Sequence, residues 1–302
     1  MNKQKLLVGA LLLSCFWACS PVGTDAIALG DENPSVNAPL YDVGTIINEP
    51  LRINYANGNK KITIYGEIIA PKGYEKQPLP LVILATGFGG SLDFVASQYA
   101  EAIAKEGFIT YSFDFYGGNV GSRSGGTMQE MSVFTQTDDL VAVLNHLSGL
   151  PFVDKNAVFL LGYSQGGLVS AIAAAENTKK VKGAVLLNAA FSLPDFARYL
   201  FKSVDDIPQT ISFEGHTLGK VYFERLLSYD IYAQLPAFKN EVLLIHAQND
   251  ELIPLLYAEK AHQIYPKSEL RIIKGATHLF SEQENTTLFP FIKSYLKRNT
   301  TK

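Results

Sequence analysis

The stretch Gly162-Tyr163-Ser164-Gln165-Gly166-Gly167 constrains the fold of this chain more than any other feature. An apolar run precedes it and a run of small residues follows it, which gives the order strand, Gly-x-Ser-x-Gly, helix. Such a turn holds the serine in a sparsely allowed backbone conformation, and its glycines let strand and helix approach where a Cβ would clash. We expect an exposed Ser164 Oγ beside free N–H groups of a helix N-terminus, which can stabilise an oxyanion. An ordinary glycine-rich turn is the alternative, so the choice depends on partners elsewhere in the chain.

The composition indicates a globular protein and gives no sign of a highly charged binding partner. The chain has 302 residues, of which 47% are hydrophobic and 18% charged, so it can bury a large core. Its net charge is −3 and it has no basic cluster, which argues against nucleic acid as a partner. Both cysteines, Cys15 and Cys19, lie near the N-terminus. The part that follows them therefore has no disulfide, cysteine-based metal site or cysteine nucleophile.

Residues 1–19 have the pattern of a bacterial export signal. Two lysines within the first five residues precede an apolar run, 6–18, that is too short to span a bilayer comfortably. The cysteines resemble those of lipoprotein signals, and we expect lipidation at Cys19, with Cys15 or a plain secretory signal as the alternatives. This predicts an exported lipoprotein of the periplasm or outer membrane, which contacts the membrane only through its lipid anchor.

Residues 20–44 are rich in Pro, Gly, Asp and Asn, and they are expected to form a tether to a domain that covers 45–302. At the start of this domain, alternating residues on both sides of the Ala56-Asn57-Gly58-Asn59 turn predict a β-hairpin. Apolar runs then alternate with helical segments, which predicts an α/β fold with an open, mostly parallel sheet and helices on both faces. The expected strands after the hairpin are 79–85, 108–114, 157–161, 181–187, 241–246 and 270–273, and the expected helices are 94–105, 133–147, 168–175, 255–264 and 288–297.

The β–α repeat breaks between about residues 190 and 235, where aromatic residues lie between short helical pieces. This segment is too long for a simple connection, so we expect a small cap over the site. Its aromatic residues are candidates for the wall of a substrate pocket, and core packing under the cap is the alternative role for each. They are Phe191, Phe196, Tyr199, Phe201, Phe213, Tyr222 and Phe223.

Ser164 needs a neighbouring base to become a nucleophile. In the chain order that goes with this turn, the acid follows the serine and the histidine comes last. His278 fits that order, because it lies in a loop directly after the strand that ends at Ile273. The other histidines lie too early, on helices or inside a strand; they are His146, His216, His246 and His262.

The acid that orients His278 is expected in the loop over residues 246–254, which follows the preceding strand. Asp250 is the candidate, Glu251 is its nearest competitor, and Asp195 is a weaker alternative. An acid in this place holds the tautomer of the imidazole and stabilises the imidazolium. Asp250 could instead cap the helix that follows it.

The oxyanion of an acyl transfer needs two N–H donors. One expected donor is Gln165, the residue after Ser164. The other is Phe88, in the glycine-rich loop after the strand over 79–85, where a turn needed only for close packing is the alternative. Such a set of groups needs no metal and no cofactor.

Together these four sites resemble the α/β-hydrolase superfamily over residues 45–298, and within it the bacterial cinnamoyl and feruloyl esterases. Thr86 departs from that pattern by replacing a histidine, and Ala247 by replacing a glycine. The segments that carry the resemblance are the oxyanion segment 86–90, the Asp-x-x-Gly-x-Gly-x-Ser-like loop 114–122, the end of the cap at 217–222 and 230–232, the acid loop 246–254 and the histidine loop 275–280.

The resemblance implies an α/β-hydrolase fold with a mostly parallel, eight-stranded sheet, helices on both faces and a small cap insertion. It also implies a serine hydrolase that forms an acyl-enzyme at Ser164 with His278 as base and Asp250 as acid. The expected substrate is a small-molecule or saccharide-linked ester, such as a cinnamoyl or feruloyl ester of plant polysaccharide. A serine peptidase and a non-catalytic ligand-binding lipoprotein on the same scaffold are the alternatives, and the oligomeric state is left open.

Overall fold

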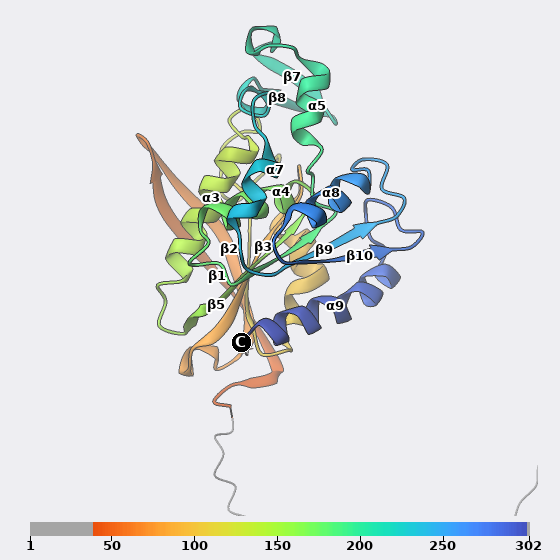
Figure 1. Cartoon of the computed structure of the whole chain (residues 1–302). Helices are drawn as coiled ribbons and strands as arrows, with labels where there is room; N and C mark the ends of the chain where they lie inside the picture. Colours follow the sequence, from red (N-terminus) through yellow and green to blue (C-terminus); the bar gives the residue numbers. More distant parts are fainter. Residues whose placement is uncertain (1–38, 301–302) are drawn as a thin grey trace, which may run out of the picture. The chain divides into compact units, whose positions relative to one another are not determined.

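The residues that the computed structural model describes, 39–300, are arranged around an eight-stranded sheet with the order β1-β2-β4-β3-β5-β6-β9-β10 (Figure 1). β2 pairs antiparallel with both of its neighbours, whereas every pairing from β4 to β10 is parallel. The carboxyl ends of the parallel strands therefore meet at one edge of the sheet. The strands are β1 (Asp42–Asn57), β2 (Lys60–Lys72), β3 (Leu79–Ala85), β4 (Ile109–Phe113), β5 (Val153–Tyr163), β6 (Gly183–Leu187), β9 (Val242–Ala247) and β10 (Ser268–Ile273).

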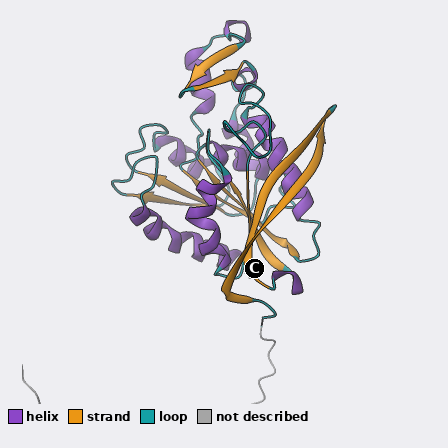
Figure 2. Ribbon diagram, turned by 180° about the vertical axis from the view of Figure 1, so that it is seen from behind, coloured by secondary structure: helices purple, strands orange, loops and turns teal. Residues whose placement is uncertain are grey.

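Side chains of the central strands alternate between two apolar clusters, one on each face of the sheet. In β5, Val158 and Leu160 belong to one cluster, and Phe159 and Leu161 belong to the other. Such strands are buried on both faces, which is why they are continuous apolar runs in the sequence. The first face is covered by α3 (Val133–Leu147), α4 (Gln165–Glu176) and α8 (Leu256–Ile264), and the second by α1 (Leu92–Val95), η2 (Ala96–Ala100), α2 (Glu101–Ala104) and α9 (Glu282–Thr300) (Figure 2).

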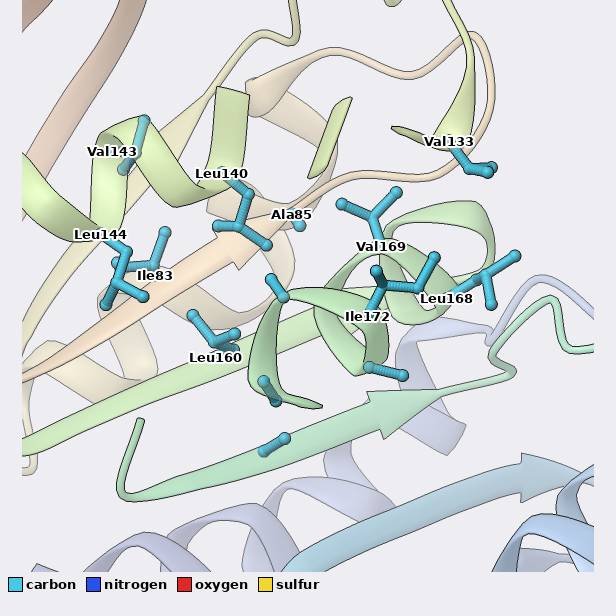
Figure 3. Packing of buried hydrophobic residues seen from close by; sticks show 14 of the residues in the cluster. Ile83, Ala85, Val133, Leu140, Val143, Leu144, Leu160, Leu168, Val169 and Ile172 are labelled. Carbon is cyan, nitrogen blue, oxygen red and sulfur yellow. The ribbon is translucent and has the colours of Figure 1, made fainter. Parts of the chain in front are cut away.

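The two helices beside the centre of the sheet form for different local reasons. α3 begins with a capping box, in which Ser132 Oγ accepts from the Thr135 N–H and Thr135 Oγ1 accepts from the Ser132 N–H. Its buried residues at helical spacing, including Leu140 and Leu144, face the sheet. α4 consists largely of small residues that pack closely, and Figure 3 shows Val169 and Ile172 beside residues of β3, β5 and α3.

The predicted hairpin, strands and helices are present, with differences where the local pattern is weak. β1 begins at Asp42, so the last residues of the predicted tether belong to the sheet; this edge strand is largely exposed and shows little alternation. The helix predicted over 94–105 is instead the three pieces from Leu92 to Ala104, with a π-helical turn in the middle. α9 starts at Glu282, earlier than predicted. Its first turns are polar and lack the apolar period that predicted a helix over residues 288–297, so the sequence did not indicate them.

The predicted cap region contains more regular structure than the sequence indicated. We call residues 190–235 the inserted segment. Its residues 193–219 lie beyond the carboxyl ends of the parallel strands, whereas residues 231–234 lie beside α4 (Figures 1 and 2). Glu214 and Gly215 both have positive φ and join β7 to β8 in a tight hairpin. A Glu-Gly pair does not predict such a hairpin from the sequence. The elements are α5 (Leu193–Leu200), η3 (Val204–Asp206), β7 (Thr210–Phe213), β8 (His216–Gly219), α6 (Val221–Glu224) and α7 (Ile231–Gln234), followed by η4 (Leu235–Ala237).

The predicted signal segment, with Cys15 and Cys19, and most of the predicted tether lie outside the described residues. Within residues 39–300, no helix is both long enough and apolar enough to cross a membrane.

A buried carboxyl group joins α3 to the edge of the sheet. Asp139 is 1% exposed, and it accepts hydrogen bonds from the Tyr55 hydroxyl of β1 and from the Tyr116 N–H at 2.9 Å. Burial raises the pKa of Asp139 to about 7, against the opposing effect of these hydrogen bonds. The folded protein therefore binds a proton at Asp139 more tightly than the unfolded chain does.

This pKa predicts how the stability changes with pH. The contribution of Asp139 to the free energy of unfolding is fully present below about pH 4 and is lost as the pH rises through about 7. From pH 5 to pH 8, the wild type should lose about 2–3 kcal/mol relative to Asp139→Asn, which carries no titrating group at this position. Urea unfolding of both proteins at each pH measures the difference. An identical pH dependence in the two proteins would contradict the assignment.

Candidate active site

Ser164 lies in the turn between β5 and α4, in a backbone conformation that a non-glycine residue rarely adopts. Its φ is 53° and its ψ is −119°. The Ser164 N–H donates to Leu187 O at 2.8 Å, and Ser164 O accepts from the N–H groups of Gly167 at 3.0 Å and Ala190 at 2.9 Å. These bonds hold the strained residue from both sides.

Glycines are required at this turn because backbone segments approach it closely. A Cβ on Gly162 would lie 2.2 Å from Gly166 O, and a Cβ on Gly166 would lie 2.4 Å from the carbonyl oxygens of Ala85 and Thr86. Any side chain at either position would therefore push α4 away from β3 and β5. This explains why the Gly-x-Ser-x-Gly pattern is needed here.

Three residues that the sequence analysis selected meet at this turn. His278 Nε2 lies 3.0 Å from Ser164 Oγ, and His278 Nδ1 lies 2.7 Å from Asp250 Oδ2. The other carboxylate oxygen, Asp250 Oδ1, accepts from the N–H groups of Leu252 and Ile253 at 3.0 and 2.8 Å. Asp250 thus orients the histidine with one oxygen and holds the backbone of its own loop with the other. It does not cap the helix α8, whose N-cap residue is Leu255, so the alternative role considered for Asp250 was wrong.

The competing acids lie elsewhere. Glu251 is exposed. Asp195, in α5, pairs with Arg198 at 2.7 Å and accepts from the Tyr257 hydroxyl at 3.1 Å. Neither carboxylate is hydrogen-bonded to His278.

Two residues that the sequence analysis missed hold the loop of His278. The Tyr163 hydroxyl and the Asn188 Nδ2 group, the latter at 2.7 Å, both donate to His278 O. Asn188 Oδ1 in turn accepts from the Ala247 N–H at 2.8 Å. Burial raises the pKa of Tyr163 to about 12, so its hydroxyl remains a donor. The available signal was their position, because Tyr163 ends β5 and Asn188 follows β6 directly.

His246 packs inside β9, as expected, and it also supports the acid loop. Its Nε2 lies 2.8 Å from Ile253 O and 3.6 Å from Asp250 Oδ2. Burial lowers the pKa of His246, so the imidazole stays neutral and donates its Nε2 proton to that carbonyl.

The loop after β3 places Phe88 beside the serine. Gly90 N–H donates to Gly87 O at 3.2 Å, which closes a turn around Phe88. A Cβ on Gly87 would lie 3.2 Å from Ser164 Cβ and 3.7 Å from its Oγ, so this loop packs directly against the nucleophile. Gln165 is the first residue of α4, and its N–H is one of the helix N–H groups that have no intrahelical partner. Both predicted donor residues are therefore adjacent to Ser164.

A pocket of about 830 Å³ opens over Ser164 and His278. Part of its wall comes from the inserted segment. Phe191 and Phe223, two of the aromatic residues considered for this wall, are instead buried in the core, and Phe201 packs against Phe223 with ring centroids 5.3 Å apart. The aromatic residues that line the pocket include Phe88, Phe94, Phe196, Tyr199, Phe213 and Tyr222.

The arrangement can support acyl transfer. A hydroxyl is hydrogen-bonded to an imidazole, the imidazole is bonded to a buried carboxylate, and N–H groups are available where an oxyanion would form. Among residues 39–300, no group of three or more His, Cys, Asp or Glu side chains is arranged to hold a metal ion.

Comparison with known proteins agrees with this geometry. The family model of the alpha/beta hydrolase fold matches residues 80–220. The structure of Est1E from Butyrivibrio proteoclasticus with ferulic acid bound superposes with a TM-score of 0.75 at 24% identity, covering 83% of this chain and 100% of that one. The fold is that of the α/β hydrolases. The predicted fold class and the resemblance to this superfamily are confirmed.

Curated relatives match this chain only in part. Escherichia coli YcjY is 25% identical over 42% of this chain and 42% of its own length. Pseudomonas aeruginosa PA2218 is 24% identical over 67% of this chain and 53% of its own length. The chain thus spans about half the length of these relatives, or less.

The geometry predicts how Ser164 reacts with an alkyl fluorophosphonate, which phosphonylates activated serine hydroxyls. Wild-type protein should gain one phosphonyl group, and Ser164→Ala should gain none. Asp250→Asn should slow the labelling by roughly 10²–10⁴-fold, because the imidazole loses its orienting partner. Intact-mass measurements over time give the rates.

Glu251→Gln is the matched control, since it removes a neighbouring carboxylate that does not contact His278. It should be labelled at the wild-type rate. If Glu251→Gln is slowed and Asp250→Asn is not, then Glu251 orients the base.

Proposed function

We propose that this protein is a serine hydrolase that cleaves carboxylic esters through an acyl-enzyme. The observation that carries the proposal is the continuous hydrogen-bonded path from Asp250 through His278 to Ser164, with separations of 2.7 and 3.0 Å. This path lies beside an aromatic-lined pocket. A serine in this setting has the base that it needs to act as a nucleophile.

In the proposed reaction, Ser164 Oγ attacks the ester carbonyl carbon while His278 Nε2 takes the hydroxyl proton. The carbonyl oxygen becomes an oxyanion that the N–H groups of Phe88 and Gln165 stabilise. The C–O bond to the alcohol then breaks as His278 returns the proton to the leaving oxygen. Water, deprotonated by His278, then attacks the acyl carbon of the acyl-enzyme. The bond from this carbon to Ser164 Oγ breaks as His278 returns the proton to Ser164 Oγ, which releases the carboxylic acid. Asp250 stabilises the imidazolium in both halves.

The proposed substrates are esters with an aromatic acyl group, of the cinnamoyl or feruloyl type, on a small alcohol or on a sugar of plant polysaccharide. The aromatic lining of the pocket supports this choice, because rings pack favourably edge to face against an aromatic acyl group. The likeness to Est1E, whose structure holds ferulic acid, agrees with it.

Ester turnover tests this function. Wild-type protein should hydrolyse p-nitrophenyl acetate and methyl ferulate, and Ser164→Ala should lose about 10⁴-fold or more in kcat on both while remaining folded. Phe196→Ala and Phe213→Ala should lower kcat/KM for methyl ferulate relative to the acetate. Expressed as a difference in activation free energy, the loss should be about 1–3 kcal/mol, the effect of a lost apolar pocket contact.

Phe201→Ala is the matched control, because Phe201 packs against Phe223 and does not line the pocket. It should leave the ranking of the two esters unchanged. A Ser164→Ala protein with a tenth of wild-type activity would refute the hydrolase mechanism, and preferential cleavage of peptides would favour a peptidase. A folded wild type that binds esters without cleaving them would favour a non-catalytic role.

We further propose that the protein is an exported lipoprotein anchored through Cys19. The sequence pattern of residues 1–19 supports this. Cys19→Ala should move the protein from the membrane to the soluble exported fraction, because the anchoring acyl chains are lost. Cys15→Ala serves as the control and should stay in the membrane fraction. If Cys15→Ala releases the protein and Cys19→Ala does not, the processing site lies four residues earlier.

A further inference from the structure

One tyrosine of the inserted segment contacts both residues that would hold the oxyanion. The Tyr222 hydroxyl donates to Gln165 Oε1, and the Tyr222 ring packs edge to face on Phe88 with centroids 6.0 Å apart. Tyr222 is 1% exposed, and burial raises the pKa of its hydroxyl, so it remains a donor. We propose that Tyr222 is a positioning residue for the oxyanion site, an inference that rests on the proposed esterase function.

The Gln165 side chain is held at both of its polar atoms. Oε1 accepts from Tyr222 in α6, and Nε2 donates to Gln136 Oε1 in α3 at 2.8 Å. Gln165 is 2% exposed and Gln136 is 1% exposed, so water does not replace a lost partner easily. The same residue carries the backbone N–H that would face the oxyanion. Anchoring its side chain from two elements therefore fixes the direction of that N–H in the first turn of α4.

This arrangement gives the inserted segment a role in the chemical step. From its sequence the segment is expected to shape the substrate pocket, and its pocket-lining phenylalanines fit that role. Tyr222 differs from them because its hydroxyl bonds to a residue of the oxyanion site. Interactions that stabilise only the transition state lower kcat when they are weakened, whereas lost substrate contacts raise KM. The proposal therefore predicts a loss in kcat that is the same for small and large acyl groups.

Tyr222→Phe is the central test, because it keeps the ring against Phe88 and removes only the hydroxyl. We expect kcat to fall by about 10- to 100-fold on both p-nitrophenyl acetate and methyl ferulate, since misplacing a donor has effects of this order. KM should stay near the wild-type value. The affinity for phenylboronic acid, which forms a tetrahedral adduct with an active serine, should fall by the same factor as kcat/KM.

A second variant and a matched control complete the experiment. Gln165→Met removes the side-chain amide and keeps the backbone N–H, so it should produce the same pattern. The double variant should be no slower than the slower single variant, because both changes remove the same hydrogen bond between Tyr222 and Gln165. Tyr229→Phe makes the same chemical change within the inserted segment, where the Tyr229 ring packs on Phe134, and should match the wild type.

The outcomes separate this inference from the proposed function. If wild-type protein hydrolyses no ester, the proposed function fails and the inference fails with it. If wild type is active, Ser164→Ala is inactive and Tyr222→Phe equals wild type, only the positioning role is wrong. A loss confined to methyl ferulate with a raised KM would assign Tyr222 to substrate contact and overturn the inference. Should Tyr222→Phe fail to fold, the kcat and KM of Gln165→Met decide the question.

Discussion

The close approach of three backbone segments at Ser164 is the constraint on which the rest of the site depends. β5, α4 and the loop after β3 meet at this turn, where no side chain fits at Gly162 or Gly166 and a Cβ at Gly87 would be in tight contact with Ser164. A non-glycine residue in such a conformation is destabilised by roughly 1–3 kcal/mol, and the bonds from Ser164 to β6 and to the start of α4 hold it there. In return, Ser164 Oγ lies at the helix N-terminus and within reach of His278, which an unstrained strand-to-helix turn would not allow.

The parallel sheet brings the other groups to this turn. Phe88 follows β3, Asp250 follows β9 and His278 follows β10, so loops distant in sequence lie at the same edge. Hydrogen bonds between those loops then set the fine geometry, because Asn188 ties the end of β9 to His278 O. The inserted segment, which follows β6, contributes pocket wall through its aromatic side chains and contacts Gln165 through Tyr222.

Much of this site could be predicted from the sequence, because strand-to-helix order, glycine spacing and chain order are local or ordinal signals. They selected the residues that meet at Ser164 and the strands that carry them. The supporting polar residues could not be found this way, since the hydrogen-bond partners of Gln136 and Asn188 come from other elements and no local pattern indicates them. The β7–β8 hairpin was missed because Glu214 occupies the turn position where Asn, Asp or Gly usually precedes the glycine, although it adopts positive φ.

Trapping the acyl group is the measurement that tests the central claim most directly. Wild-type protein is mixed with a slowly deacylating aromatic ester, the reaction is stopped with acid within the first turnover, and the digested peptides are analysed by mass spectrometry. The account predicts one acyl group, attached to the Oγ of Ser164 and absent from Ser164→Ala. Ester turnover with the acyl group on another residue would contradict the account, as would continued turnover by the Ser164→Ala protein.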